Sequence, residues 1–559
     1  MENNGIFVPR PGSDNETATE AATDRTVQMT QKQRQTKTVA KREEKISKYG
    51  LYTIIYAVFA TFCLYKNHRG ITFPFFAIST VAYYVLCLRK MEGKWQRKDI
   101  WYPIVITLLG VSVFLTEDKQ MTGLAKCMTA ILIGIFGLHI LYDEKEWKFM
   151  GYIQALIQLI GGTVENCVSA FSETFVFMQN ARNKEEKVDK EGNPVTKKNS
   201  KLLYVGIGIL VSIPLVAVIL ALLCKADAVF KEAVDRILEV IDLENIIGVL
   251  ITMLFIFTVS YAVIRYLDEK SISVDDKEHH VYEPVLAITV TSIITVIYLF
   301  FCGIQVIYLT FGNFLTLPDG YTYAKYAREG FYELLTVCIL NLIIVLVASY
   351  FFGESRVLKA ILTVICICTY VMIASSAYRM MLYVREYDLT RLRVYVLYAL
   401  VVLAVLLAGV IIYIYRESFP LFRYGITIIT VAVTILVFSH PTVLIARYNI
   451  YQMTERHRMI DIDHLCELGT DAIPVILENF DELYEYEQTH YKGKEYRNGE
   501  YYDGNSHMMR FYEENFGKWA DDEDYDCPSY DMSFRSFNLS KFFAQKANKR
   551  HILKIDNML

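Results

Sequence analysis

About eleven apolar stretches, most close to the roughly 20 residues that a helix needs to cross a bilayer, constrain this chain more than any other feature. Lipid offers no hydrogen-bond partner to a free backbone group, and the stretches lack the polar and apolar alternation of barrel strands. The chain is therefore expected to be an all-α, polytopic transmembrane helical bundle. The expected spans are residues 51–65, 71–88, 101–115, 121–142, 202–223, 246–267, 286–311, 334–352, 357–378, 394–415 and 421–438.

The composition agrees with a membrane protein. Of the 559 residues, 53% are hydrophobic and 21% are charged, which is more apolar than a typical soluble domain. The formal net charge of -4 hides an asymmetry, because basic residues crowd the first apolar stretches while the C-terminal tail is acidic. The expected partner is the lipid bilayer, with a possible protein partner at the tail and no nucleic acid.

Shifts in composition divide the chain into five regions. Residues 1–45 are polar and lack the apolar core of a secretory signal, so they are expected to form a disordered basic arm. The remaining regions are a four-span N-terminal cluster (46–142), an amphipathic helix followed by a Lys-rich cytoplasmic loop (143–201), a seven-span core (202–446) and a small, polar, mainly helical C-terminal domain (447–559).

Basic loops suggest how the chain is oriented in the membrane. The sequence RKMEGKWQRK at 89–98 and the Lys-rich stretch at 182–201 both fall on the side of the basic N-terminus, and this side is expected to be cytoplasmic. An odd number of spans then leaves the C-terminal domain outside. A segment with Arg379, Arg385, Arg391 and Arg393, expected to be an external loop, contradicts the charge rule, so the orientation of the C-terminal half stays open.

Two further segments have apolar residues at helical spacing without being spans. Residues 149–178 are expected to form a helix that lies in the interface or packs under the bundle. A second helix is expected from Ala226, either as a lid over a vestibule or as a buttress for loops.

Six motifs carry a resemblance to a known family. They are GYTYAKYAREGFYEL (320–334), AYRMMLYVREYDLTRLR (377–393), HPTVLIARYNI (440–450), ADAVF (226–230), LGTDAIP (468–474) and FRSFNLSKFFA (534–544). In this combination the chain resembles the bacterial membrane family called domain of unknown function 4173, which is related to the 4153 set. The resemblance implies a location in the bacterial cytoplasmic membrane. It implies no established activity and no catalytic residue.

The chain departs from the pattern of that family at two positions. Asp388 stands where the family usually has Gly, and His440 stands where it usually has Asn. Because Asp tolerates a left-handed backbone better than most residues, a turn built for Gly is expected to survive at Asp388.

Ionisable groups at membrane depth are the best candidates for a site, because an unpaired charge there is costly. Arg379 is the strongest candidate, and its proposed counter-ion is Glu333 or, alternatively, Glu283. A ligand site for a polar or anionic molecule is one interpretation, since guanidinium groups bind anions well. The other is structural, because Arg and Tyr also anchor helix ends at the interface. The remaining candidates are Arg328, Tyr323, Tyr326, Gln305, Asn341, Thr390 and Arg391.

Several enzyme classes lose their usual sequence support. No GxSxG, Walker-type, HExxH or GxGxxG motif occurs, so no catalytic residue, metal site or cofactor is proposed. Three hypotheses remain. The protein transports or senses a polar or anionic ligand, serves as a membrane-embedded scaffold or sensor with a dry bundle, or is an intramembrane enzyme.

Overall fold

The computed structural model describes residues 48–142, 147–184, 243–274, 282–311, 331–490, 507–516 and 534–556, apart from single positions within them, together with five isolated positions between 219 and 227. Within these ranges the regular structure consists of helices, with no strand. The prediction of an all-α fold is confirmed.

Eight of the described helices are long and apolar enough to cross a membrane. They are α2 (Thr72–Lys90), α4 (Lys119–Leu141), α8 (Leu243–Glu269), α9 (Pro284–Phe311), α11 (Phe331–Phe351), α12 (Arg356–Tyr387), α13 (Arg391–Tyr415) and α14 (Leu421–Phe438). Two shorter apolar helices are Lys48–Leu64 and α3 (Trp101–Leu115). These helices match ten of the eleven expected spans, and the remaining one, at 202–223, lies almost entirely outside the described residues.

Exposed apolar side chains show which surfaces of these helices meet lipid. On α9, Val296 is 68% exposed and Phe300 is 75% exposed. A soluble protein rarely exposes apolar surface in such continuity. The chain is an integral membrane protein.

The other described helices are polar or amphipathic. The prediction of a helix at 149–178 is confirmed by α5 (Phe149–Lys184), while the helix expected from Ala226 lies almost wholly outside the described residues. A short 3-10 helix, η1 (Arg97–Ile100), precedes α3. The small helical C-terminal domain is also confirmed, and it contains α15 (Pro441–Thr454), α16 (Ile462–Cys466), η3 (Thr470–Ala472), α17 (Ile473–Glu478), α18 (Phe480–His490), α19 (His507–Phe516) and α20 (Leu539–Asp556).

The chain forms two compact units. The first comprises residues 1–61 and 161–269, and the second comprises residues 62–160 and 270–559. In the first unit, the Tyr49 hydroxyl donates a hydrogen bond of 2.7 Å to Asp268, and the Lys48 ammonium lies 3.2 Å from the same carboxylate. These contacts join the start of the helix Lys48–Leu64 to the end of α8.

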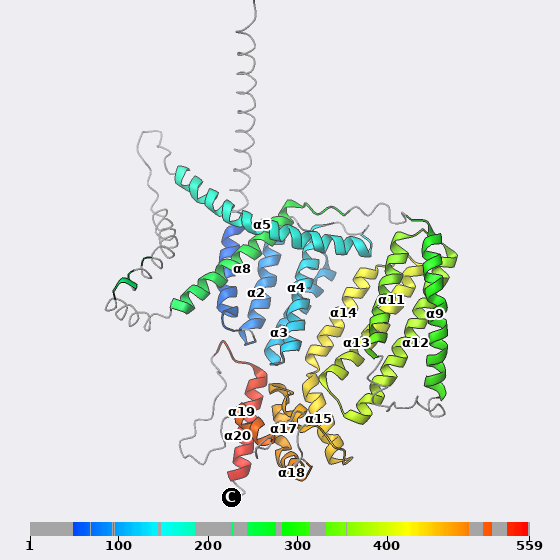
Figure 1. Cartoon of the computed structure of the whole chain (residues 1–559). Coiled ribbons are helices and arrows are strands. Elements are labelled where there is room, and N and C mark those ends of the chain that lie inside the picture. The colour runs from blue at the N-terminus through cyan, green and yellow to red at the C-terminus, as the bar shows by residue number, and fades with distance from the viewer. Residues whose placement is uncertain are drawn as a thin grey trace, which may run out of the picture. The chain divides into compact units, whose positions relative to one another are not determined.

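In the second unit the apolar helices stand side by side (Figure 1). The hairpin neighbours α2, α3 and α4 pack on one another, and α12 packs against α9, α11 and α13. Helix α14 contacts both α13 and α4, so it joins the two groups. Residues that are fully buried among α11, α12 and α13 include Cys338, Val345, Leu362, Ile365 and Leu400.

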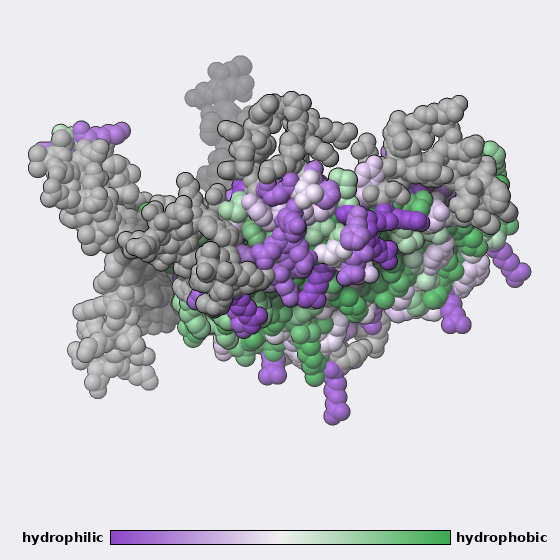
Figure 2. Space-filling view, turned by 90° about the horizontal axis from the view of Figure 1, so that it is seen from below, coloured by the Kyte–Doolittle hydropathy of each residue, from purple (hydrophilic) through white to green (hydrophobic). Residues whose placement is uncertain are grey.

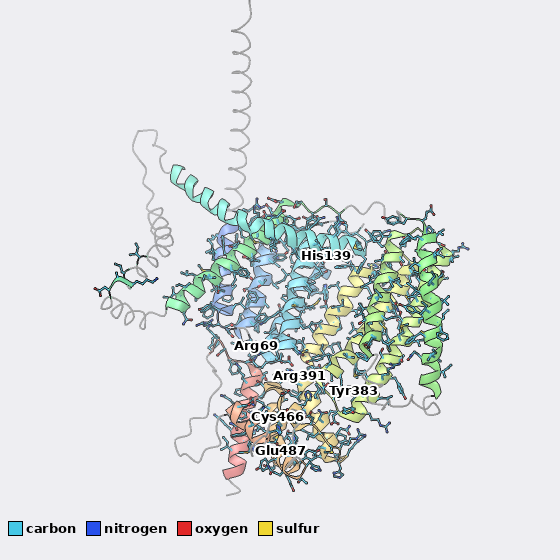
Figure 3. All side chains as sticks on the ribbon, in the orientation of Figure 1. Arg69, His139, Tyr383, Arg391, Cys466 and Glu487 are labelled. Atoms are coloured by element: carbon cyan, nitrogen blue, oxygen red, sulfur yellow. The ribbon has the colours of Figure 1, made fainter. Side chains whose placement is uncertain are left out.

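The C-terminal domain packs at one end of the helices of the second unit. Figure 3 places Arg69 and Arg391 at that end and His139 at the opposite end. The turn between α3 and α4, at residues 116–118, lies at the end that carries the domain, and the basic loop between α2 and α3 lies at the other. Within this unit, the domain and the basic loop are therefore on opposite faces.

The structure corrects the expected loop after Tyr378. Helix α12 continues to Tyr387, so Arg379 and Arg385 lie on the helix, and the connection to α13 is only Asp388 to Thr390. Nothing in the segment stops a helix, because Arg, Met and Leu are good helix formers. Asp388 takes the expected positive φ, at 65°.

Two side chains hold the short turn after α12. Arg393, whose guanidinium lies 4.1 Å from the centre of the Tyr383 ring, donates to the carbonyls of Tyr387 and Asp388. The Asn449 side chain exchanges hydrogen bonds of 3.0 and 2.9 Å with the backbone of Leu389. Because Asn449 lies on α15, the turn is fixed to the C-terminal domain.

The packing of α13 on α14 gives a first prediction. A Cβ at Gly409 would lie 2.2 Å from the ring of Tyr424, whereas a Cβ at Gly425 would meet Leu406 at an ordinary 3.9 Å. We expect Gly409→Ala to destabilise the protein, because overpacking costs about 1–3 kcal/mol and exceeds the gain of about 1 kcal/mol in helix propensity. Thermal unfolding of the solubilised protein checks this. Gly425→Ala is the matched control, and equal melting temperatures for the two variants would contradict the packing argument.

Candidate functional site

A buried carboxylate joins the C-terminal domain to the membrane helices. Asp471 lies on the 3-10 helix η3, between Gly469, whose φ of 83° suits a residue without a side chain, and Pro474 at the start of α17. Its carboxylate accepts hydrogen bonds from the Glu117 amide at 2.9 Å, from the Ser540 hydroxyl at 2.5 Å and from the Thr116 hydroxyl. The side chain is only 4% exposed.

The donors come from distant parts of the sequence. Thr116 and Glu117 form the turn between α3 and α4, and Ser540 is in the first turn of α20. A fourth group, the imidazole Nδ1 of His440, lies 3.6 Å from the same carboxylate. His440 lies just before α15 with a φ of 46°, a left-handed backbone in which His, Asn and Asp are found more often than most residues.

The hydrogen bonds to Asp471 lower the pKa of its carboxyl group. Burial raises the pKa of this carboxyl, but the nearby His440 imidazole and the hydrogen bonds from Glu117, Ser540 and Thr116 together outweigh burial and leave the pKa below its ordinary value. The carboxylate is therefore charged when the C-terminal domain is packed on the turn.

A second set of contacts surrounds this carboxylate. The Asn538 amide donates to the carbonyls of Arg69 at 2.9 Å and Thr116 at 3.2 Å. The backbone amide of Ile71 donates to the carbonyl of Phe537 at 2.8 Å, and the Arg535 guanidinium donates to the carbonyl of Tyr65. The segment that leads into α20 is thus bonded to two turns on this face, the turn at residues 65–71 before α2 and the turn between α3 and α4. We call the contacts of Asp471 and Asn538 the junction.

A cavity of about 840 Å³ opens beside the junction. Asp471 and Ser540 form part of its wall, and helices α15, α17 and α20 supply most of the rest. On this face of the molecule, hydrophilic residues gather over the C-terminal domain, with hydrophobic residues beside it (Figure 2). The cavity is lined by Leu115, His440, Val443, Arg447, Asp471, Pro474, Val475, Leu477, Glu478, Leu539, Ser540, Phe543, Lys546, Ala547, Arg550 and His551.

Positive charge dominates the accessible part of this lining. Arg447, Lys546 and Arg550 are exposed, and none of them forms an ion pair with a residue in the described ranges. The carboxylates in the lining are Asp471, which the junction already uses, and the exposed Glu478. The arrangement suits an anion, and guanidinium groups add directional hydrogen bonds to its oxygens.

The structure brings together some of the residues singled out from the sequence. The Gln305 side-chain oxygen accepts hydrogen bonds from Arg379 at 3.1 Å and from Ser375 at 2.6 Å, and all three residues are buried between α9 and α12. Asn341 forms a separate cluster, in which it accepts from Tyr298 at 2.6 Å and donates to Thr369 at 2.9 Å.

The other candidates lie elsewhere. Glu333 is exposed in the first turn of α11. Thr390 directly precedes α13 and makes no capping hydrogen bond with its side chain, and Arg391 donates a hydrogen bond of 2.8 Å to the carbonyl of Glu467 in the C-terminal domain. Tyr323, Tyr326 and Arg328 lie outside the described residues. None of the six candidates that the structure describes lines the cavity of about 840 Å³.

Sequence reasoning missed the residues of the junction. A signal was nevertheless present, because three of the quoted motifs contain them. HPTVLIARYNI holds His440 and Arg447, LGTDAIP holds Asp471, and FRSFNLSKFFA holds Asn538 and Ser540. In the described part of the chain no group of three or more His, Cys, Asp or Glu side chains is placed to hold a metal ion.

A family model described as "Domain of unknown function (DUF4153)" matches residues 104–479, which is more than half of the chain. The chain belongs to this family. The expected relation to the 4153 set is confirmed, whereas membership of the 4173 family is not. The match to DUF4153 includes Thr116, His440 and Asp471 and ends before α20. No curated protein and no solved structure matches the chain.

The buried carboxylate gives a second prediction. We expect Asp471→Asn to lower the stability of the packed C-terminal domain by at least about 1.5–3 kcal/mol, the size of one charge-assisted hydrogen bond. In the folded protein the pKa of Asp471 is lower than its ordinary value of 3.8. The contribution of Asp471 to the stability of the packed domain is therefore complete above pH 3.8, and it is lost as the pH falls through the lower pKa of the folded state.

Hydrogen exchange of α20 between pH 3 and 7 measures this effect. The wild type is expected to lose protection toward the acid end, and Asp471→Asn is expected to show weak protection with a flatter dependence on pH. Glu482→Gln, which removes an exposed carboxylate from α18, is the control. An Asn variant that keeps the acid transition of the wild type would show that another group controls it.

Proposed function

We propose that the protein is a membrane-embedded sensor that binds a polar or anionic ligand in the cavity beside the junction. The observation that carries this proposal is that Asp471 and Ser540 belong both to the junction and to the wall of the cavity. A ligand in the cavity therefore touches the groups that hold the C-terminal domain on the α3–α4 turn. A ligand that favours one state of this contact shifts the population toward that state.

The charges around the cavity support an anionic ligand. Arg447 comes from α15, and Lys546 and Arg550 come from α20, so an anion bound between them would connect two elements of the domain. The volume, about 840 Å³, falls in the range of about 300–1,000 Å³ that is common for small-molecule sites.

Transport of a polar solute is the second candidate, and the buried cluster of Gln305, Ser375 and Arg379 favours it. A guanidinium among apolar helices is costly unless polar groups surround it, and such groups often mark a solute pathway. In this proposal the sequence-derived candidates, including Glu333, Asn341, Thr390 and Arg391, line or flank the path. A dry scaffold would use the same hydrogen bonds only to pair buried polar groups.

We also propose that the C-terminal domain is extracytoplasmic. The loop at residues 89–98 carries five Lys or Arg residues, whereas the α3–α4 turn carries Glu117, Asp118 and Lys119. Because short basic loops stay in the cytoplasm, the face with the domain is the outer one. This assignment rests on contacts within one unit and does not depend on the number of spans.

Thiol labelling in spheroplasts of an expressing bacterial host tests the orientation. Arg97 in the basic loop and Glu482 in the C-terminal domain are both exposed. We expect an impermeant maleimide to label Glu482→Cys beyond the wild-type background and to spare Arg97→Cys until the cells are lysed. The reverse pattern would place the domain in the cytoplasm.

Native mass spectrometry of the purified full chain tests the ligand site without knowledge of the ligand. We expect a bound anionic species on the wild type that is lost in R447Q/K546Q/R550Q, because that variant removes the three accessible cations of the cavity. Lys549→Gln is the matched control, since Lys549 is exposed on α20 and does not line the cavity.

Other outcomes of this measurement separate the candidates. Loss of the species in Arg379→Gln, with retention in R447Q/K546Q/R550Q, would favour the membrane cluster and the transport hypothesis. Absence of any bound species on the wild type in mild, non-ionic conditions would count against the proposed sensor.

A further inference from the structure

Helix α20 presents two kinds of side chain to the cavity. Leu539, Phe543 and Ala547 are spaced by four residues and form an apolar row, and Lys546 and Arg550, also spaced by four, form a basic row beside it. Residues three or four apart lie next to one another on a helix. Phe543 is 47% exposed, although it is a large apolar side chain.

The facing elements repeat this pairing. On α15, Val443 and Arg447 are four residues apart and both line the cavity. Helix α17 adds Pro474, Val475 and Leu477 to the apolar wall. The cavity therefore combines a cationic part with a continuous apolar part. A small, fully polar anion would satisfy the cations and leave the apolar wall in water, which is unfavourable.

The cavity also adjoins the ends of membrane helices. Leu115 is the last residue of α3, and His440 lies two residues after the end of α14, and both belong to the lining. In Figure 1, α15 continues from α14 into the C-terminal domain, where α17 and α20 lie. A molecule that resides in the adjoining leaflet has its headgroup at this level.

From these observations we infer that the ligand is an anionic amphiphile, a lipid with a phosphate headgroup. Arg447, Lys546 and Arg550 bind the phosphate, and Leu115, Val443, Leu539 and Phe543 cover the first methylenes of the acyl chains. This inference rests on the proposed function and names the ligand class of the same site. A headgroup phosphate and a free phosphate ester share the cationic contacts, and only the lipid fills the apolar wall.

Calorimetric titration of the full chain, held in a non-ionic amphipol, tests the inference. The probes are dihexanoyl-phosphatidylglycerol, dihexanoyl-phosphatidylcholine and glycerol 3-phosphate. We expect the phosphatidylglycerol to bind at least tenfold more tightly than the other two. Each buried methylene contributes about fourfold in affinity, and the zwitterionic headgroup brings no net charge to the cations.

Matched variants separate the contribution of the cations to the affinity from that of the apolar wall. Lys546→Gln combined with Arg550→Gln is expected to weaken binding of the phosphatidylglycerol at least tenfold, with Lys549→Gln unchanged. Phe543→Ala is expected to weaken it severalfold. Phe542→Ala is the control for that change, because Phe542 is a neighbouring exposed ring that does not line the cavity. Melting temperatures close to the wild type show that the variants fold.

The failures of the two proposals are distinguishable. Equal affinity for glycerol 3-phosphate and phosphatidylglycerol would overturn the amphiphile and leave an anion sensor. Equal affinity for both lipids, insensitive to the loss of Lys546 and Arg550, would reveal nonspecific apolar partitioning and would also overturn the inference. If no probe binds while the native species persists, the lipid class is wrong but the sensor stands. If neither binds, both proposals fail.

Discussion

The arrangement of the second unit depends on a carboxylate that is removed from water. Asp471 is charged and nearly buried, a state that is costly unless donors surround it. Its donors belong to the α3–α4 turn and to the start of α20, and the imidazole of His440, in the link between α14 and α15, lies 3.6 Å away. Each of these elements must be in place for the others to be satisfied. One side chain thereby couples an N-terminal hairpin, a central span and the C-terminal helix.

The membrane helices and the C-terminal domain of this unit are stabilised in different surroundings, lipid and water. In the bilayer, apolar faces meet lipid, and the helices associate through close packing, as where the Tyr424 ring covers Gly409. The C-terminal domain has a core of its own, with Ile476, Leu483, Met508 and Phe516 fully buried. The contact between the two parts is rich in hydrogen bonds, many of them from side chains to backbone groups, and includes a few apolar contacts such as Phe114 with Phe537. Such a contact is specific in geometry and is weaker than an apolar core.

The sequence predicts the membrane helices well because lipid imposes a length and a composition on each of them. The boundaries of α3 and α14 agree with the expected spans to the residue. The continuation of α12 past Tyr378 was missed, because a charged residue after an apolar run resembles the end of a span, although Arg propagates a helix readily. Arg379 and Gln305 were both selected, yet their hydrogen bond requires the register of α9 against α12, which no local pattern contains.

The junction could not be predicted for a related reason. Asp471, Ser540 and Thr116 are common polar residues in polar segments, and each is equally typical of a solvated turn. Only the fold brings together positions separated by 355 residues, as Thr116 and Asp471 are. The motifs marked the right segments without indicating that they meet. Asp388 differs, since its positive φ was expected from the resemblance to the 4173 family, which implied a Gly at this position.

The link between α14 and α15 consists of Ser439 and His440 alone. Two residues span only about 7 Å and leave little slack, and Pro441 stiffens the start of the helix that follows. A two-residue link with this backbone therefore restricts the angle between α14 and α15, so that the tilt of α14 in the bilayer, which depends on bilayer thickness, and the direction of α15 are not independent. The direction of α15 is in this way tied to that of α14 by the connection itself, in addition to the hydrogen bonds of the junction.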